Sequence, residues 1–230
     1  MKAPTYRYEL INSSLLKFGK RAKYLEIGVC NPRVCFNRIE TDNKDGVDPG
    51  VEFPDNPVKY KLTSDEFFRK LEGGELDKDP DYQWDVIFID GLHLSYQVER
   101  DIHNALRHLN PKGFILLHDC NPPTSFMARE DYMIDGKYEP LKEYRYLKNK
   151  IWNGTVWKAF FKFRATNPYF DTCVVDTDWG VGVIRFGSNK SNVSISDNPF
   201  YEYNIMALNR KKHLGLIHPN EWYEWLNNKK

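Results

Sequence analysis

Acidic and histidine side chains recur where apolar segments of this 230-residue chain end. Asp90 ends one strongly apolar run, and His93 follows three residues later, just before an amphipathic segment. His118 and Asp119 end a second apolar run. Histidine exchanges a proton near neutral pH, so His93 is the first candidate for a general base, and His118 or Asp119 is the second. The alternative is that Asp90 caps a turn and that His93 is an exposed loop residue.

Asp90 and Asp119 could also act together on a cation. Divalent hard cations prefer carboxylate oxygens, so the pair is a candidate metal site. Two acids alone do not specify a metal, however, and they could instead offset the charge of a cationic ligand or cap turns. The interpretation without a metal is therefore favoured.

A second group of residues has the spacing of a nucleotide or cofactor site. Glu26 and Gly28 end an apolar segment, but Cys30 and Arg33 stand where a G-x-G-x-x-G motif would have its later glycines. Their absence argues against NAD, whose pyrophosphate needs close backbone approach. Asp48 lies 22 positions beyond Glu26, near the spacing at which an acid binds ribose hydroxyls. The alternative is a solvated loop acid.

Short apolar runs alternate with amphipathic stretches, which is typical of a parallel sheet covered by helices. The expected strands are 24–29, 46–48, 58–62, 85–90 and 114–119, with a closing pair at 173–176 and 181–186. The expected helices are 8–18, 63–71, 95–109 and 222–226. Asp90 and Asp119 then emerge at the carboxyl ends of strands, where open α/β sheets bind ligands. We expect one α/β domain over residues 1–230, with an acceptor-pocket insertion at 120–158.

Composition excludes several classes of protein. The formal net charge of +1 provides no general attraction to nucleic acid, and no apolar run reaches the roughly 18 residues of a membrane span. The N-terminus lacks the pattern of a signal peptide. The four cysteines form no CxxC pair, which favours reduced thiols in a cytoplasmic protein over a zinc cluster.

Taken in order over roughly residues 20–190, these segments resemble the class I S-adenosylmethionine (SAM)-dependent methyltransferases. They are most similar to the O-methyltransferases of sugars and small molecules that are associated with polysaccharide and macrolide-sugar modification. The stretches that carry the resemblance are Tyr24–Val29, Gly46–Gly50, Thr63–Phe68, Phe88–His93, Leu117–Pro122, Asn153–Lys158 and Asp176–Gly182.

The resemblance implies a Rossmann-like, seven-stranded, mostly parallel sheet with helices on both faces, SAM as methyl donor and a sugar-like small-molecule acceptor. The cofactor contacts that it implies are Glu26 and Gly28 near the methionine part, Asp48 on the ribose, Ser64 and Asp65 beside the adenine, and Asp90. Metal-using sugar relatives carry paired acids after the fifth strand. This chain has His118 and Asp119 there, so a metal is not favoured.

Two other functions remain open at this point. One is a methyltransferase that acts on a macromolecule or a nitrogen atom, and the other is a SAM- or nucleotide-binding protein without catalysis. Asn121–Thr124 resembles the Asn-Pro-Pro-aromatic motif of amino methyltransferases, but it follows the fifth strand and ends in threonine. We therefore interpret it as a rigid turn.

Overall fold

The computed structural model describes residues 2–53, 56–130, 152–188 and 191–228. Within them, seven strands form one sheet in the order β2-β1-β3-β4-β6-β5-β7. The strands are β1 (Tyr24–Ile27), β2 (Lys44–Val47), β3 (Trp84–Ile89), β4 (Leu109–Leu117), β5 (Phe170–Val175), β6 (Val181–Phe186) and β7 (Leu216–Ile217). β6 runs antiparallel to both neighbours and the other pairs are parallel. The predicted Rossmann-like, mostly parallel sheet is confirmed.

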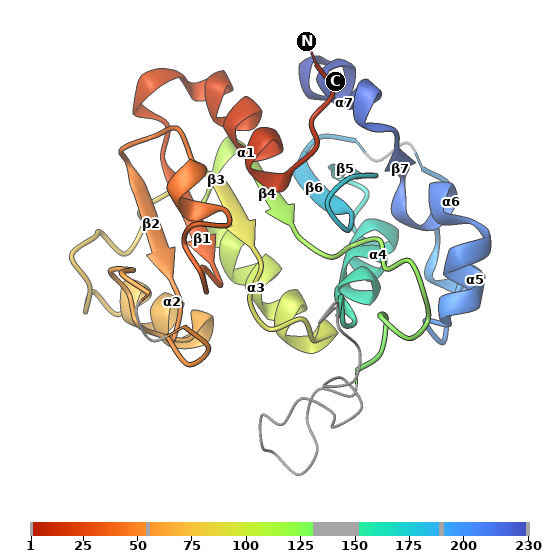
Figure 1. Cartoon of the computed structure of the whole chain (residues 1–230), viewed down its shortest axis with the longest axis horizontal. Helices are drawn as coiled ribbons and strands as arrows, with labels where there is room; N and C mark the ends of the chain where they lie inside the picture. The colour runs from red at the N-terminus through yellow and green to blue at the C-terminus, as the bar shows by residue number, and fades with distance from the viewer. Residues whose placement is uncertain (1, 54–55, 131–151, 189–190, 229–230) are drawn as a thin grey trace.

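Helices cover both faces of this sheet (Figure 1). They are α1 (Arg7–Leu15), α2 (Ser64–Glu72), α3 (Ser95–Arg107), α4 (Val156–Thr166), α5 (Tyr203–Leu208), α6 (Arg210–Leu214) and α7 (Trp222–Asn227). Because side chains alternate along a strand, Tyr24 belongs to the apolar cluster that includes residues of α1 and α7, while Leu25 belongs to the cluster that includes residues of α2, α3 and α4. None of the described helices has the length and hydropathy needed to cross a membrane.

The structure corrects two local expectations. The strand expected at 58–62 is reduced to a single bridge between Tyr60 and Val47, and the two-residue β7 at the opposite edge brings the sheet to seven strands. The first helix, expected over 8–18, ends at Leu15, and Leu16 is 75% exposed. The chain continues as a 3₁₀ segment in which Gly19 has a φ of +74°, which ends the helical repeat. Of the expected insertion at 120–158, residues 131–151 lie outside the described residues.

Backbone hydrogen bonds join the loops at the carboxyl edge of the sheet. The amide of Gly28 donates to Val47 O, and the amide of Asp90 donates to Ile27 O, both at 2.8 Å. The amide of Cys120 donates to Gly180 O at 2.9 Å, which attaches the β5–β6 loop to the end of β4. The loops that follow β1, β3, β4 and β5 therefore meet at one place.

Candidate active site

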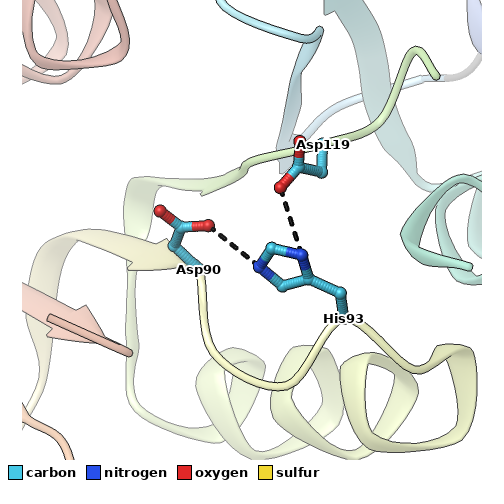
Figure 2. Close-up of side chains that lie close together, drawn as sticks. All are labelled: Asp90, His93 and Asp119. Atoms are coloured by element: carbon cyan, nitrogen blue, oxygen red, sulfur yellow. Dashed lines mark ion pairs between the residues drawn. The ribbon is translucent and has the colours of Figure 1, made fainter. Parts of the chain in front are cut away.

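Three of the predicted residues meet at this edge, as Figure 2 shows. The His93 ring lies between two carboxylates, with Nε2 3.4 Å from Asp90 Oδ1 and Nδ1 3.3 Å from Asp119 Oδ2. His93 Nδ1 is also 3.2 Å from Trp152 O, and the two rings stack with centroids 5.3 Å apart. The His93 side chain remains 21% exposed. The ring is thus held in a defined orientation and is still accessible to a ligand.

His118 lies deeper in the same group. Its Nδ1 is 2.9 Å from Asp119 Oδ2 and 3.2 Å from Asp90 Oδ1, and its side chain is only 5% exposed. Asp119 takes a φ of +60°, and its other oxygen accepts a hydrogen bond from Asn153 Nδ2. His118 therefore bridges the two carboxylates from inside the protein, whereas His93 approaches them from the accessible side.

Sequence reasoning missed two members of the group, Arg7 and Asp178. Arg7 Nη1 lies 2.6 Å from Asp90 Oδ2, and its Nε and backbone amide each donate to Asp178 Oδ2 at 2.9 Å. His118 Nε2 lies 3.5 Å from Asp178 Oδ1. Asp178 lies in the stretch Asp176–Gly182, which carried part of the family resemblance, so the sequence did offer a reason to consider it as a site residue. Arg7 is 83 positions from Asp90 and follows no motif, so no local pattern could have found it.

The group contains three carboxylates, one guanidinium and two imidazoles, and their charges set the protonation states. Burial acts to raise the pKa of Asp90, but His118 and Arg7 hold it well below its usual range. Burial acts to lower the pKa of His118, but Asp119 and Asp90 raise it well above its usual value. The pKa of His93 is raised above 6.5 because Asp119 and Asp90 outweigh burial. Both imidazoles are therefore biased toward the charged form near neutral pH.

Asp90, His93 and Asp119 could also hold a metal ion. Each offers one ligand atom, and these atoms all lie within 4.8 Å of one another. Two carboxylate oxygens and one imidazole nitrogen suit several divalent cations. The imidazole ligand must be neutral, however, and Arg7 already contacts the other oxygen of Asp90. A cation could bind here only by displacing protons from the histidines.

Gly28 and Asp48 hold the neighbouring loops together. A Cβ on Gly28 would stand 2.3 Å from Asp90 O, so only glycine allows this contact between the loops after β1 and β3. Asp48 Oδ2 accepts from the Cys30 amide at 2.7 Å, and its Oδ1 accepts from the Gly50 amide at 2.6 Å. Each oxygen keeps a second lone pair, so the carboxylate can still accept from ribose hydroxyls.

The remaining predicted cofactor residues lie in two other places. Ser64 and Asp65 open α2, where Gln97 Nε2 of α3 donates to Ser64 Oγ at 3.1 Å and to Asp65 Oδ1 at 3.2 Å. Glu26 is buried on the face covered by α1 and accepts a 2.6 Å hydrogen bond from the Tyr24 hydroxyl. Burial raises the pKa of Glu26 to about 8. Ligand contacts of these three residues stay predictions.

Residues 32–120 match a family described as a methyltransferase domain, and this segment spans β2, β3, β4 and the loops that carry Asp48, Asp90 and Asp119. The matched segment is under half of the chain, and the sheet that contains it has the class I methyltransferase fold. The predicted enzyme class, a methyltransferase, is thereby confirmed. A search of curated protein sequences found no match to the chain.

Several solved structures are similar to the methyltransferase. An O-methyltransferase from Bacillus cereus in complex with S-adenosylhomocysteine (SAH) is 14% identical, with a TM-score of 0.46 over 80% of this chain and 84% of that chain. The SAH-bound methyltransferase PaMTH1 from Podospora anserina is 17% identical, with a TM-score of 0.44 over 78% and 77%. MycE from the mycinamycin biosynthetic pathway, in complex with Mg, SAH and mycinamycin VI, is 12% identical, with a TM-score of 0.42 over 88% and 53%. Similarities this distant carry no inference about ligands.

Proposed function

We propose that this methyltransferase transfers a methyl group from SAM to a hydroxyl oxygen of a sugar or another small polar acceptor. The supporting observation is the accessible His93 ring between Asp90 and Asp119. An alcohol is a poor nucleophile until its proton is removed, and a positioned imidazole can remove it. The structure also has four free cysteines, in keeping with a cytoplasmic enzyme.

The surroundings of His93 indicate which nitrogen would accept the proton. Asp119 and Trp152 O both lie near Nδ1 and favour a proton there, while Nε2 has only the 3.4 Å contact with Asp90. The neutral ring would therefore present Nε2 to the acceptor hydroxyl. As the proton moves from the hydroxyl to Nε2, the two carboxylates stabilise the imidazolium that forms.

The donor would lie along the carboxyl ends of β1 and β2. Asp48 would accept from the ribose hydroxyls, with its orientation set by the amides of Cys30 and Gly50. Ser64 and Asp65 would lie beside the adenine at the start of α2, and Glu26 and Gly28 near the methionine part. When bound, SAM supplies an activated methyl group on a sulfonium, and the protein's part is to align the acceptor oxygen behind it.

The proposal needs no metal. Arg7 and His118 already offset the charge of the carboxylates of the site, and a protein base performs the deprotonation that a cation would otherwise assist. Asp90 and Asp119 are then orienting and charge-stabilising groups, with Asp90 beside the cofactor.

The test is the rate of SAH formation by purified protein supplied with SAM and a panel of sugar hydroxyl acceptors. His93→Ala should lower kcat by about 10²–10⁴-fold while SAM affinity changes little. A base must be neutral, so wild-type activity should rise with pH through a pKa above 6.5, and the variant should lose this rising limb. His103→Ala, which removes an exposed histidine of α3, is the matched control.

Two results would contradict parts of this proposal. A His93→Ala enzyme with wild-type kcat and an intact rising limb would transfer the role of base to His118 or Asp119. If the protein binds SAM but forms no SAH with any acceptor, it is a SAM-binding protein without catalysis, and the proposed methyl transfer is wrong.

A further inference from the structure

A pocket of about 430 Å³ lies between the N-terminal segment and the segment that follows β1. Residues 6–8 of the N-terminal segment line it, together with Arg33, Val34 and Arg38 and with Asp178 of the β5–β6 loop. Arg7 is both a lining residue and the partner of Asp90 in the active site. The pocket therefore shares a wall with the catalytic group.

The pocket carries excess positive charge. Three guanidinium groups face one carboxylate, and that carboxylate, Asp178, is already paired with Arg7. In the part of the chain that the structure describes, the Arg33 side chain has no hydrogen bond or ion pair. The Arg38 side chain donates to the Arg33 carbonyl through Nε at 3.2 Å, and its guanidinium carbon lies 4.9 Å from the centroid of the Tyr8 ring. Neither arginine is thus paired with a carboxylate of the described residues.

The same pocket has an aromatic face. The rings of Tyr6 and Tyr8 stack with centroids 5.5 Å apart and an interplanar angle of 10°, and Tyr6 is 51% exposed. An accessible aromatic ring packs well against the C–H face of a sugar ring, and a guanidinium pairs in bidentate fashion with phosphate or carboxylate. The lining thus combines a surface for a sugar ring with a site for an anion.

We infer that this pocket binds an anionic substituent of the methyl acceptor, and that the acceptor is a sugar bearing a phosphate or a carboxylate. This inference rests on the proposed function and specifies the substrate class of the same site. A neutral sugar would leave Arg33 and Arg38 without partners. Because Arg7 lines the pocket and contacts Asp90, an anion bound there would be held one side chain away from the residues that position His93.

The test is calorimetric titration of the protein in the presence of SAH. Glucose, galactose and mannose are compared with their 1-phosphates and their uronic acids, so that the two kinds of anion are distinguished. At least one charged sugar should bind about tenfold or more tightly than its neutral parent, and more weakly as salt increases. Arg33→Gln and Arg38→Gln should each weaken that binding about tenfold, because each removes a charged hydrogen-bond donor. Arg107→Gln, which removes an exposed arginine paired with Glu72 at the far end of α3, should change nothing.

Four outcomes would overturn the inference, and the first three concern ligand binding. The charged sugars could bind no more tightly than their neutral parents. Their binding could be unchanged by both arginine substitutions. Inorganic phosphate could bind as tightly as the sugar phosphates. SAH affinity is measured in the same samples, and an effect of the substitutions on SAH instead of the sugar would also overturn it. If the charged sugar binds as predicted but the protein forms no SAH, the binding pocket is confirmed and the proposed methyl transfer is refuted.

Discussion

Replacement of Gly28 by alanine tests the contact on which the site is built. A Cβ at this position would lie 2.3 Å from Asp90 O and 2.5 Å from both the Asp90 carbonyl carbon and Gly91 Cα. These are backbone atoms of a loop tied to Ile27 by a hydrogen bond, so they cannot yield as a flexible side chain would. Gly28 also has a φ of +84°, which disfavours any residue with a Cβ.

The Gly50→Ala variant separates the backbone penalty of a positive φ from the penalty of the clash. It has a similar φ of +74°, but nothing lies within 4 Å of where its Cβ would be. Gly50→Ala should therefore cost only the left-handed backbone penalty of about 1–2 kcal/mol. Gly28→Ala should cost the same penalty plus about 1–3 kcal/mol for overpacking, or about 2–5 kcal/mol in total. The displaced atoms belong to Asp90, so methyl transfer should fall as well.

Urea unfolding of the wild type and both variants measures the free energies, and SAH release measures activity. We expect Gly28→Ala to be less stable than Gly50→Ala by at least about 1 kcal/mol, since the clash is present only at Gly28. Equal destabilisation of the two variants would show that the loops do not approach as closely as described. Wild-type activity in a stable Gly28→Ala enzyme would show that the Asp90 position does not depend on this contact.

Two further predictions concern the cofactor and the metal. Asp48→Ala should weaken SAM binding by about 1.5–3 kcal/mol, measured by calorimetry, because hydrogen bonds to a charged carboxylate are lost. Asp42→Ala, at an exposed acid just before β2, should leave the affinity unchanged, and wild-type affinity in Asp48→Ala would exclude the ribose contact. Chelator treatment should leave SAH formation intact, since Arg7 and His118 supply the positive charge at Asp90 and Asp119. Activity that disappears with the chelator and returns with magnesium would establish a metal at these acids.

The sequence by itself determined most of the sheet and the residues at its functional edge. Apolar runs predicted the strands that became β1, β3 and β4, and the residues that follow each run are placed by covalent connection. Because these strands are parallel, their carboxyl ends meet at one edge, and so Asp90, His93 and Asp119 lie together as expected. The start of the helix expected over 63–71 was likewise predictable, since the capping box of Thr63 and Glu66 at the start of α2 lies within four residues.

Only the tertiary structure decided how the group is completed and which histidine is accessible. Arg7 reaches Asp90 across 83 positions and Asp178 across 171, and pairing at such distances depends on how α1 and the β5–β6 loop pack. His93 and His118 follow similar strands and have the same local chemistry, yet packing leaves one at 21% exposure and the other at 5%. Their raised pKa values arise from the same packing, because burial and the distance to each carboxylate set the balance between desolvation and charge. Local patterns carry no record of burial depth or of distant charges, so these properties could not be predicted from the chain alone.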